Sequence, residues 1–333
     1  MREALIMQDS WGRNIDYLRI SVTDRCSLRC CYCMPPEGVP LTCHEDILRF
    51  EEIVRIVTVL ARMGLKTVRL TGGEPLVRRD IGRLAAALKA VPGIETVALT
   101  TNGLRLGELA ADLVKAGLDE VNVSLDTLDP ETFRIITGSD GLDQVLESIR
   151  VCRRAGLPVR LNCVPVSCGS GRDRDLADIA AIARDQDIAV RFIEMMPIGP
   201  GADLASYRQD QLMDLLQRRF GPARPSASHP GKGPAVYYEF AGFKSLVGFI
   251  SPLSHCFCDS CSRIRLSAAG VLQPCLAYED GVDLKSCLLE GGGRALEQAL
   301  EKALSAKPRR HDFQDRGAAG RPADRRSMSG IGG

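Results

Sequence analysis

Short segments with a strand-like pattern recur six times in the first two hundred residues of the chain. In residues 17–22, apolar and polar side chains alternate, as they do in a half-buried strand. Five further strands are expected at residues 67–71, 96–100, 120–125, 159–166 and 189–194. The pattern therefore predicts six strands spread over one continuous stretch of chain.

Helical patterns fill the intervals between these strands. In residues 50–63 the apolar positions Ile53, Ile56, Val57 and Leu60 have helical spacing. Further helices are expected near residues 80–90, 106–116 and 176–183, with helical stretches before residue 154. The alternation of strands and helices predicts βα units and a parallel sheet.

Six βα units are fewer than the eight that close a complete barrel. We therefore expect an α/β fold with an open, partial (β/α)6 barrel, and a doubly wound sheet is the alternative. In both folds, ligands bind at the carboxyl ends of the strands. The cysteine loop at residues 24–33, the GGEP loop, the TTNG segment and the segment at residues 124–126 all lie at such ends.

The pattern changes after Pro197. A break at residues 198–201 precedes a helix near residues 209–219, and residues 222–234 are rich in Pro, Ser and Gly, as in a loop. Residues 236–248 contain strand-like stretches. Residues 307–333 are rich in Gly, Arg and Asp with few apolar residues, which is typical of a flexible tail.

These changes divide the chain into three parts. We expect a barrel at residues 14–200, a C-terminal extension at residues 201–306 that contains a second group of cysteines, and a tail at residues 307–333.

Composition places the chain among ordinary globular proteins. It has 333 residues, of which 45% are hydrophobic and 26% charged. The net charge of +1 gives no overall field that favours nucleic acid or an anionic membrane. The first ten residues lack the apolar segment of a signal peptide, and no apolar run approaches transmembrane length. The 13 cysteines are clustered, so we expect reduced thiols and a cytoplasmic location.

The first cysteine cluster has the spacing C-x3-C-x2-C. Its members are Cys26, Cys30 and Cys33, in a loop directly after the first strand. A four-iron cluster normally takes four cysteines, so three thiolates leave one iron open to another ligand. Cys31 lies outside the spacing and is not expected to be a ligand.

The second cluster has the spacing C-x2-C-x13-C. Cys258, Cys261 and Cys275 can hold either a second cluster with an open iron or, with His255, a Cys3His zinc ion. Arg263 and Arg265 lie between them, and on an extended strand both point the same way. Two guanidinium groups beside a metal site suit a phosphate or a nucleotide.

Glycines and strand arginines add a second set of candidates. Gly72-Gly73-Glu74-Pro75 follows a strand, where glycines let a ligand approach the backbone and Glu74 can accept a hydrogen bond from an ammonium group. Arg19, Arg69 and Arg160 lie on strands, and an arginine that faces a core must be paired or bind an anion.

Together these residues resemble the radical S-adenosylmethionine (SAM) enzymes, which have C-x3-C-x2-C with an aromatic residue before the third cysteine, then GGEP. The ordered motifs narrow the resemblance to the GTP 3′,8-cyclase family, which opens molybdenum cofactor biosynthesis. They are DRCSLRCCYCMP, RLTGGEPLVRRD, TTNG, NVSLD, RFIEMMP, FCDSCSRIRL and the terminal GIGG. The match runs from about Arg19 to Gly333.

The resemblance implies a role for each matching residue. A 4Fe–4S cluster that binds SAM would be held by Cys26, Cys30 and Cys33. A second 4Fe–4S cluster, whose open iron meets guanine, would be held by Cys258, Cys261 and Cys275. The implied SAM contacts are Tyr32, Gly73, Glu74, Ser124 and Met196. The implied GTP contacts are Arg19, Arg69, Thr100, Arg160, Arg263, Ile264 and Arg265.

Arg160 and the C-terminal glycines have a special place in this resemblance. The family usually has Lys at the position of Arg160, so a guanidinium fork replaces a point donor. Its members end in Gly-Gly and thread the terminus into the barrel, so Gly332 and Gly333 are implied to act in catalysis. Neither Cys31 nor Cys256 is a ligand position in the family.

The resemblance also implies a reaction and partners. SAM cleavage would give a 5′-deoxyadenosyl radical that takes the C3′ hydrogen of GTP, and C3′ would then bond to C8. GTP would bind without a P-loop, since the chain has no G-x4-G-K-[ST]. The implied partners are an electron donor such as flavodoxin or ferredoxin and the downstream cyclic pyranopterin monophosphate synthase. A monomer or homodimer without nucleic acid or membrane contacts is expected.

Two other functions stay open. One is another radical SAM enzyme with an auxiliary cluster, such as a peptide-modifying maturase. The other is a non-catalytic iron–sulfur carrier or a zinc-binding interaction protein. The Arg263-Ile264-Arg265 segment and the terminal Gly-Gly favour the cyclase over the maturase. The GGEP loop after a strand and the βα rhythm disfavour the carrier.

Overall fold

All six predicted strands are present in the computed structural model, which describes residues 6–168, 171–290, 292–313, 326, 328, 330 and 331. They are β1 (Tyr17–Ser21), β2 (Thr67–Thr71), β3 (Thr96–Thr101), β4 (Glu120–Ser124), β5 (Val159–Cys163) and β6 (Ala189–Ile193). Each pairs in parallel with the next along the chain. This order is that of a barrel, because a doubly wound sheet reverses its strand order at a switch point.

The second half of the chain extends the same sheet at both edges. Strand β10 (Arg263–Leu266) pairs in parallel with β1, and β9 (Val247–Ile250) pairs in parallel with β6. Four short antiparallel strands complete the sheet: β7 (Ala223–Pro225), β8 (Val236–Phe240), β11 (Val271–Gln273) and β12 (Val282–Asp283). Within the described residues the order is β12-β11-β10-β1-β2-β3-β4-β5-β6-β9-β8-β7. The partial barrel is therefore wider than six strands, and its outer strands come from the C-terminal extension.

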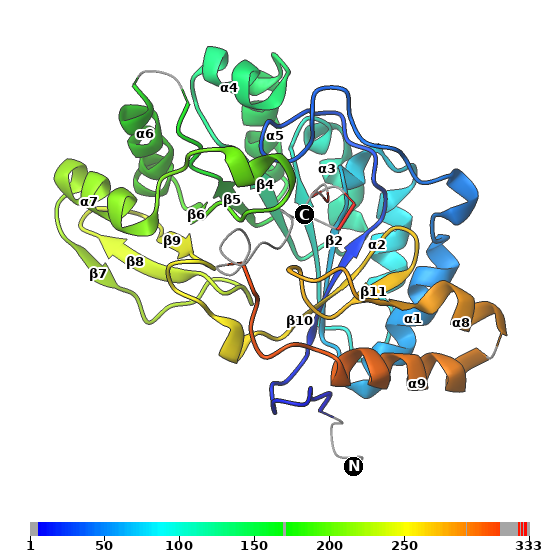
Figure 1. Cartoon of the computed structure of the whole chain (residues 1–333). Coiled ribbons are helices and arrows are strands. Elements are labelled where there is room, and N and C mark those ends of the chain that lie inside the picture. Colours follow the sequence, from blue (N-terminus) through cyan, green and yellow to red (C-terminus); the bar gives the residue numbers. More distant parts are fainter. Residues whose placement is uncertain are drawn as a thin grey trace.

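The helices follow the predicted intervals closely and lie outside the sheet (Figure 1). They are α1 (Phe50–Met63), α2 (Ile81–Lys89), α3 (Leu106–Lys115), α4 (Pro130–Thr137), α5 (Leu142–Arg154), α6 (Arg172–Asp185) and α7 (Gln209–Phe220). Two further helices, α8 (Leu284–Glu290) and α9 (Gly292–Ser305), were not anticipated and pack beside α1.

Local signals explain where α4 begins and ends. The carboxylate of Asp129 accepts a hydrogen bond from the backbone N–H of Thr132 at 2.8 Å, which caps the first turn. Pro130 occupies the first helical position, where its missing N–H costs nothing. Gly138 then adopts a left-handed conformation and ends the helix. The end of α4 contacts the cysteine loop described below.

The two faces of the parallel strands differ in polarity. On β1 and β2, the fully buried residues Leu18, Ile20, Val68 and Leu70 belong to the core under the helices. Residues between these positions, such as Arg19, belong to the opposite, inner face. The sequence thus builds a dry outer layer and a polar interior, which is where a polar ligand can bind.

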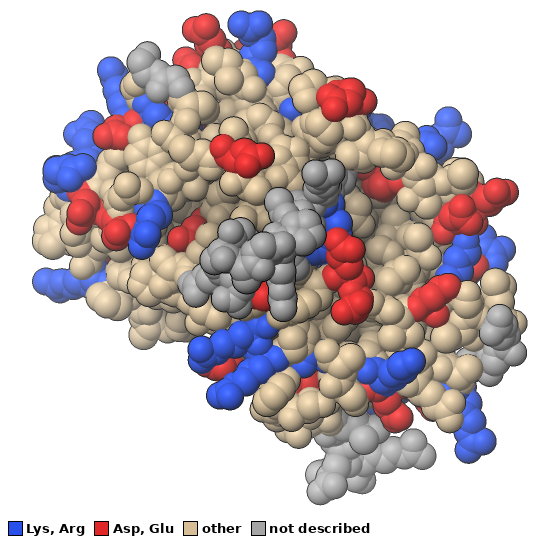
Figure 2. Space-filling view, in the orientation of Figure 1, with Lys and Arg blue, Asp and Glu red and all other residues tan. Residues whose placement is uncertain are grey.

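The surface of the molecule has no large region of one charge among the described residues on the face shown (Figure 2). On the face visible in Figure 2, basic and acidic side chains are interspersed, in keeping with the net charge of +1. No helix in the described part of the chain is long and apolar enough to cross a membrane. The segment after α9 is packed more tightly than its composition predicts: Lys307 is 3% exposed and Phe313 5%.

Candidate active site

A cavity of about 350 Å³ lies where the carboxyl ends of the strands meet the C-terminal extension. Its walls contain most of the predicted site residues: Arg19, Cys26, Cys30, Tyr32, Cys33, Arg69, Gly73, Thr100, Ser124, Arg160, Met196, Cys258, Cys261, Arg263, Arg265 and Cys275. Glu74 and Ile264 are buried and do not line it. Gly332 and Gly333 lie outside the described residues. The structure therefore gathers both cysteine sets and the strand arginines around one space.

Backbone hydrogen bonds hold the first cysteine loop. The N–H of Cys33 donates to the carbonyl of Cys30 at 2.9 Å, which closes a tight turn. The N–H of Cys31 donates to the carbonyl of Ile136 at 2.8 Å, at the end of α4. The loop is thus fixed by its own turn and by a neighbouring helix, and the thiols of Cys26, Cys30 and Cys33 all reach the cavity wall.

The GGEP loop supports this cysteine loop from the side. The N–H of Gly73 donates to the carbonyl of Thr23 at 2.7 Å. A Cβ atom on Gly73 would lie 2.3 Å from the carbonyl oxygen of Arg25, closer than any side chain can approach. Gly72 has φ +148° and its Cβ would lie equally close to the oxygen of Thr23. Glycine is required here because two backbones pass within contact distance.

Glu74 completes the GGEP loop in an unexpected way. Its carboxylate accepts hydrogen bonds from the N–H of Leu76 at 2.9 Å, the N–H of Asn102 at 2.7 Å and the hydroxyl of Thr101 at 2.8 Å. Burial raises the pKa of Glu74 to about 7, although these donors act in the opposite direction. The side chain therefore ties the loop after β2 to the loop after β3.

Tyr32 and Asp126 form a polar contact above the same wall. The hydroxyl of Tyr32 donates to the carboxylate of Asp126 at 2.7 Å, and the N–H of Val164 donates to that carboxylate at 2.8 Å. Burial raises the pKa of Asp126. The pKa of Tyr32 is also raised, mainly by burial and to a lesser extent by the negative charge of Asp126. The pair holds the aromatic ring between the cysteine loop and the end of β4.

Three arginines stand side by side on neighbouring strands. Arg265 on β10 is in register with Arg19 on β1, and Arg19 is in register with Arg69 on β2. Residues in register on parallel strands point the same way, so all three face the cavity. The Nε atoms of Arg19 and Arg265 are buried without a hydrogen-bond partner among the described residues. Burial, and then the neighbouring charge of Arg265, lowers the pKa of Arg19 to about 9.

One carboxylate pairs with two of the strand arginines. Glu120 pairs with Arg69 and, at 2.6 Å, with Arg160. Burial raises the pKa of Glu120, but the hydrogen bond from Arg160 and the charge of Arg69 outweigh it, and the pKa falls to about 2. Among the described residues, eight Lys and Arg side chains but only three carboxylates line the cavity, so its wall suits a bound anion.

Three of these cations were missed by the sequence analysis: Arg191, Lys232 and Lys307. Arg191, on β6, is 4% exposed and donates to the side-chain oxygen of Asn162 at 3.0 Å. It lies in the RFIEMMP motif at an inward strand position, which is the signal that could have identified it. Lys232 comes from the glycine-rich loop before β8 and also reaches the wall. No local pattern marks Lys232, because a loop's fold depends on what it packs against.

The second cysteine set is held by a tight turn and by cations. The N–H of Cys261 donates to the carbonyl of Cys258 at 3.2 Å. The ammonium group of Lys307 donates to the carbonyls of Pro274 at 2.6 Å and Arg263 at 2.9 Å and lies 3.8 Å from the sulfur of Cys261. Burial raises the pKa of Cys261, but Arg263 and Lys307 outweigh it and lower the pKa to about 7. At this site a thiolate is stabilised before any metal binds.

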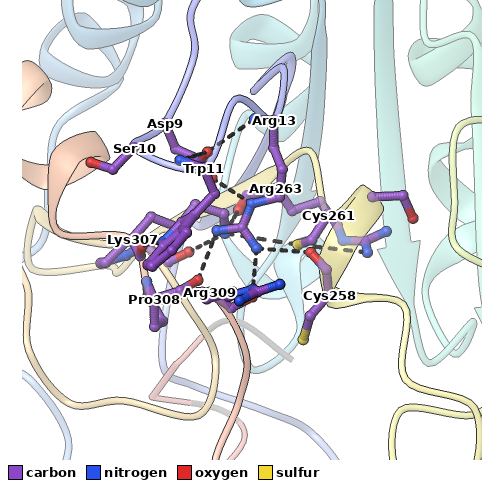
Figure 3. A network of polar contacts seen from close by, with 12 residues as sticks. Asp9, Ser10, Trp11, Arg13, Cys258, Cys261, Arg263, Lys307, Pro308 and Arg309 are labelled. Atoms are coloured by element: carbon purple, nitrogen blue, oxygen red, sulfur yellow. Dashed lines mark hydrogen bonds and ion pairs between the residues drawn. The ribbon is translucent and has the colours of Figure 1, made fainter.

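A segment near the N-terminus fixes the position of Lys307 (Figure 3). Arg13 donates to the carbonyls of Cys258 at 2.8 Å, Pro308 at 2.7 Å and Arg309 at 2.9 Å. The indole N–H of Trp11 donates to the carbonyl of Lys307 at 2.9 Å. The second site is therefore assembled from both ends of the described chain.

The histidine beside the second site is not the one that the spacing suggested. The ring of His255 is exposed and contacts the hydroxyl of Ser254 at 3.2 Å. His311, which is distant in sequence, lines the cavity and lies close to Cys256 and Cys258. Tertiary structure brings this ring in, so no sequence spacing could have revealed it.

The donor chemistry of both sites fits iron–sulfur clusters. All thirteen cysteines fall within the described residues and are free thiols. Burial raises the pKa of Cys26 and, strongly, that of Cys30. Thiolates in such surroundings need a cation nearby, which a cluster's iron supplies. Each site offers three thiols and leaves the fourth position of a cluster free for another ligand.

Comparisons with known proteins place these features in a family. Residues 20–185 match the Radical SAM superfamily, and residues 188–313 match Molybdenum Cofactor Synthesis C. The chain is 46% identical to the GTP 3′,8-cyclase of Heliobacterium modesticaldum, over 98% of this chain and 100% of that protein. It is 44% identical to the GTP 3′,8-cyclase of Desulforamulus reducens over the same shares of both proteins.

Solved structures with the same fold are more distant in sequence. Streptococcus suis SuiB bound to S-adenosylmethionine is 17% identical, with a TM-score of 0.61 over 88% of this chain and 66% of that one. The enzyme anSMEcpe with bound AdoMet is 16% identical, with a TM-score of 0.61 over 89% of this chain and 79% of that one. At this identity the similarity establishes the radical SAM fold alone.

Proposed function

Because the chain belongs to the GTP 3′,8-cyclase family of radical SAM enzymes, we propose that it converts GTP to 3′,8-cyclo-7,8-dihydroguanosine 5′-triphosphate. This is the first step of molybdenum cofactor biosynthesis. The single observation that supports it best is the shared cavity: two cysteine triads and a row of arginines face one space, and the buried Nε atoms of Arg19 and Arg265 have no hydrogen-bond partner among the described residues.

The first site is proposed to start the reaction. Cys26, Cys30 and Cys33 would hold a 4Fe–4S cluster with SAM on its open iron. With one electron from its donor, this pair would supply methionine and a 5′-deoxyadenosyl radical that takes the C3′ hydrogen of GTP, so that C3′ can bond to C8 of guanine. A second electron and a proton would complete the product. Tyr32, Gly73, Ser124 and Met196 line the wall beside these thiols, which supports the SAM contacts expected for them.

Glu74 has a different part in this proposal. Its carboxylate is already occupied by three donors and is turned away from the cavity, so it would position the GGEP backbone that SAM contacts. Gly73 brings that backbone to the wall. A SAM ammonium group would then be bound by backbone carbonyls rather than by this carboxylate.

The arginines are proposed to bind the triphosphate. The buried Nε atoms of Arg19 and Arg265 have no partner in the described part of the chain, and removing a guanidinium from water is costly unless an anion replaces the water. Arg69, Arg160 and Arg263 complete the cationic wall. A planar fork matches phosphate oxygens, so Arg160 can serve at the position where the family usually has Lys.

The second cluster is proposed to hold the guanine. Cys258, Cys261 and Cys275 would be its ligands, and Thr100 reaches the same cavity from β3. Ile264 points to the other side of β10, where it is 1% exposed in the apolar core, so its part in GTP binding would be through its backbone.

The C-terminal residues are proposed to approach this site. Ile331 is 5% exposed and packs with Ile198 and Leu276, and Met328 lines the cavity. Gly332 and Gly333 follow directly in sequence, so they are placed near the reaction space in this proposal.

Anaerobic reconstitution tests the proposal. About eight irons per chain are expected, together with a SAM- and GTP-dependent cyclised nucleotide detected by mass spectrometry. A chain with eight irons that cleaves SAM but leaves GTP unchanged would overturn the assignment of the substrate. In that case a peptide-modifying radical SAM enzyme would be the alternative, although the arginine wall disfavours it. We further propose flavodoxin or ferredoxin as electron donor and cyclic pyranopterin monophosphate synthase as the next enzyme.

A further inference from the structure

One group of three metal-binding side chains lies at the edge of the second site. Within the residues that the structure describes, ligand atoms of Cys256, Cys258 and His311 all lie within 4.8 Å of one another. Cys256 and Cys258 flank Phe257 at the start of a 3-10 helix, and His311 comes from the packed segment after α9. Cys256 is exposed, so the group opens to solvent on one side.

The histidine ring is oriented as a metal ligand would be. Its Nε2 lies 2.8 Å from the carbonyl oxygen of Pro252, and a carbonyl can only accept, so Nε2 carries the proton. The lone pair of a neutral ring is then on Nδ1. This atom is buried and has no hydrogen-bond partner among the described residues. A ring nitrogen fixed by a backbone carbonyl on its far side is the usual arrangement around a bound metal.

The separations suit one ion rather than a cubane cluster. Two Zn–S bonds of about 2.3 Å at a tetrahedral ion place the sulfurs roughly 3.8 Å apart. The ligand atoms of the three residues lie within 4.8 Å of one another, which is close to this separation. Three corners of a four-iron cluster hold their thiolates farther apart, because the cluster lies between them.

Charge separates this group from the rest of the second site. Lys307 lies 3.8 Å from the sulfur of Cys261, and Arg263 lies 3.9 Å from it. These two cations disfavour a divalent ion at Cys261. Two thiolates from Cys256 and Cys258 neutralise a divalent ion on the other side, and an imidazole completes a donor set that zinc prefers.

We propose that Cys256, Cys258 and His311 form a site for a single zinc ion, with its fourth position open to water. Cys258 is also a ligand of the second cluster proposed above, so zinc and that cluster exclude each other; only this last clause rests on the proposed function. Zinc would keep the thiols of the empty site from oxidation and would have to leave before the second cluster is inserted.

Zinc titration of the cluster-free full chain tests the site. All proteins would carry Cys26→Ser, Cys30→Ser and Cys33→Ser, so that the first loop cannot take the metal. Zinc affinity would be measured anaerobically against a chromophoric chelator. Cys256→Ser and His311→Gln are each expected to weaken zinc binding by about tenfold or more. Cys43→Ser, which alters an exposed cysteine elsewhere, is the matched control and should bind zinc as the background protein does.

A second measurement keeps the test independent of folding in that background. With the native first loop, reconstitution in the presence of zinc should lower the iron content from about eight toward four, and Cys256→Ser should restore it. Unchanged zinc affinity in both Cys256→Ser and His311→Gln would overturn the proposal and assign the metal to Cys258, Cys261 and Cys275. An iron content near four without zinc would instead count against the second cluster, whatever the zinc result.

Discussion

The two cysteine sites face the same cavity but are held in different ways. The first lies in one loop, closed by the hydrogen bond from Cys33 to Cys30 and braced by Gly73. The second has a similar turn from Cys258 to Cys261, but it takes Cys275 from another segment and is also held by Lys307 and Arg13, which are distant in sequence. Cysteine spacing was enough to recognise both sites, whereas the distant residues that hold the second site could not be predicted from it.

The electrostatics of the two sites differ in the same way. At the first site burial raises the pKa of Cys30 well above its usual value. At the second site burial acts in the same direction on Cys261, but Arg263 and Lys307 reverse it. The first site therefore depends on its metal for charge balance, and the second is already cationic. A cationic surrounding suits the anionic substrate and the second cluster that we propose for this site.

The largest effect is expected at the first site. Cys26→Ala should reduce SAM cleavage below detection, because one of three cluster ligands is lost and the open iron with it. The yield of 5′-deoxyadenosine, measured by chromatography, reports this directly. Cys43→Ala is the control and should cleave SAM normally. Full cleavage by Cys26→Ala would show that this thiol is not a ligand.

Loss of a ligand at the second site should separate the two functions. Cys261→Ala is expected to retain the first cluster and some uncoupled SAM cleavage, but to lose GTP conversion. The reason is that the second site is proposed to hold substrate rather than to start the radical. Absorbance, iron content and both products would be measured together. Normal cyclisation by a protein shown to lack the second cluster would remove that cluster from the mechanism.

A smaller effect is expected in the arginine row. Arg19→Ala removes a partly buried cation whose Nε atom has no hydrogen-bond partner among the described residues, so GTP binding should weaken while the fold is kept. A charge-assisted hydrogen bond is worth about 1.5–3 kcal/mol, which is roughly tenfold to a hundredfold in Kd. Calorimetry of Arg19→Ala should show little change in the Kd for SAM. The exposed control Arg62→Ala should bind GTP with an unchanged Kd. Equal weakening of both ligands would indicate a folding defect instead.

The smallest effect concerns the cations around Cys261. In the cluster-free protein, alkylation of Cys261 should follow a pH midpoint of about 7, because thiolate is the reactive form. Lys307→Met removes one positive charge, so the midpoint should rise toward the usual value near 9. Mass spectrometry of the peptide that contains Cys261 gives the midpoint, and exposed Lys302→Met is the control. A midpoint that Lys307→Met leaves in place would assign the shift to Arg263 alone.

Local sequence patterns were enough to predict the six inner strands and the edge of the sheet, at their carboxyl ends, where ligands are expected to bind. The six strands depend on side-chain alternation and flanking helices, which short windows of sequence contain, and all six are present. The partial barrel is also confirmed, as the family and the solved structures agree with it. The spacing of Cys26, Cys30 and Cys33 predicted that the three cysteines form one site. They do lie together at the cavity wall, because one loop contains all three.

Long-range structure accounts for what the sequence did not reveal. Strand β11 is three residues long, too short to show a period of two, and is specified by its partner β10. Lys307 was assigned to a flexible tail because composition contains no information about the carbonyls that surround it. His311 reached the second site, in place of the expected neighbour His255, for the same reason.

The pairing of β10 with β1 also constrains the order of events during synthesis. β1 is among the first strands to leave the ribosome, but its partner on one side, residues 263–266, is made only after three quarters of the chain. Until then β1 is an open sheet edge, which is the kind of surface that pairs with other chains. The barrel half of a nascent chain therefore stays exposed along this edge until β10 is made, and the first cysteine loop lies directly beside it. A chain that ends between residues 193 and 263 would leave that edge permanently unpaired. Such truncated chains should aggregate even though all six inner strands are complete.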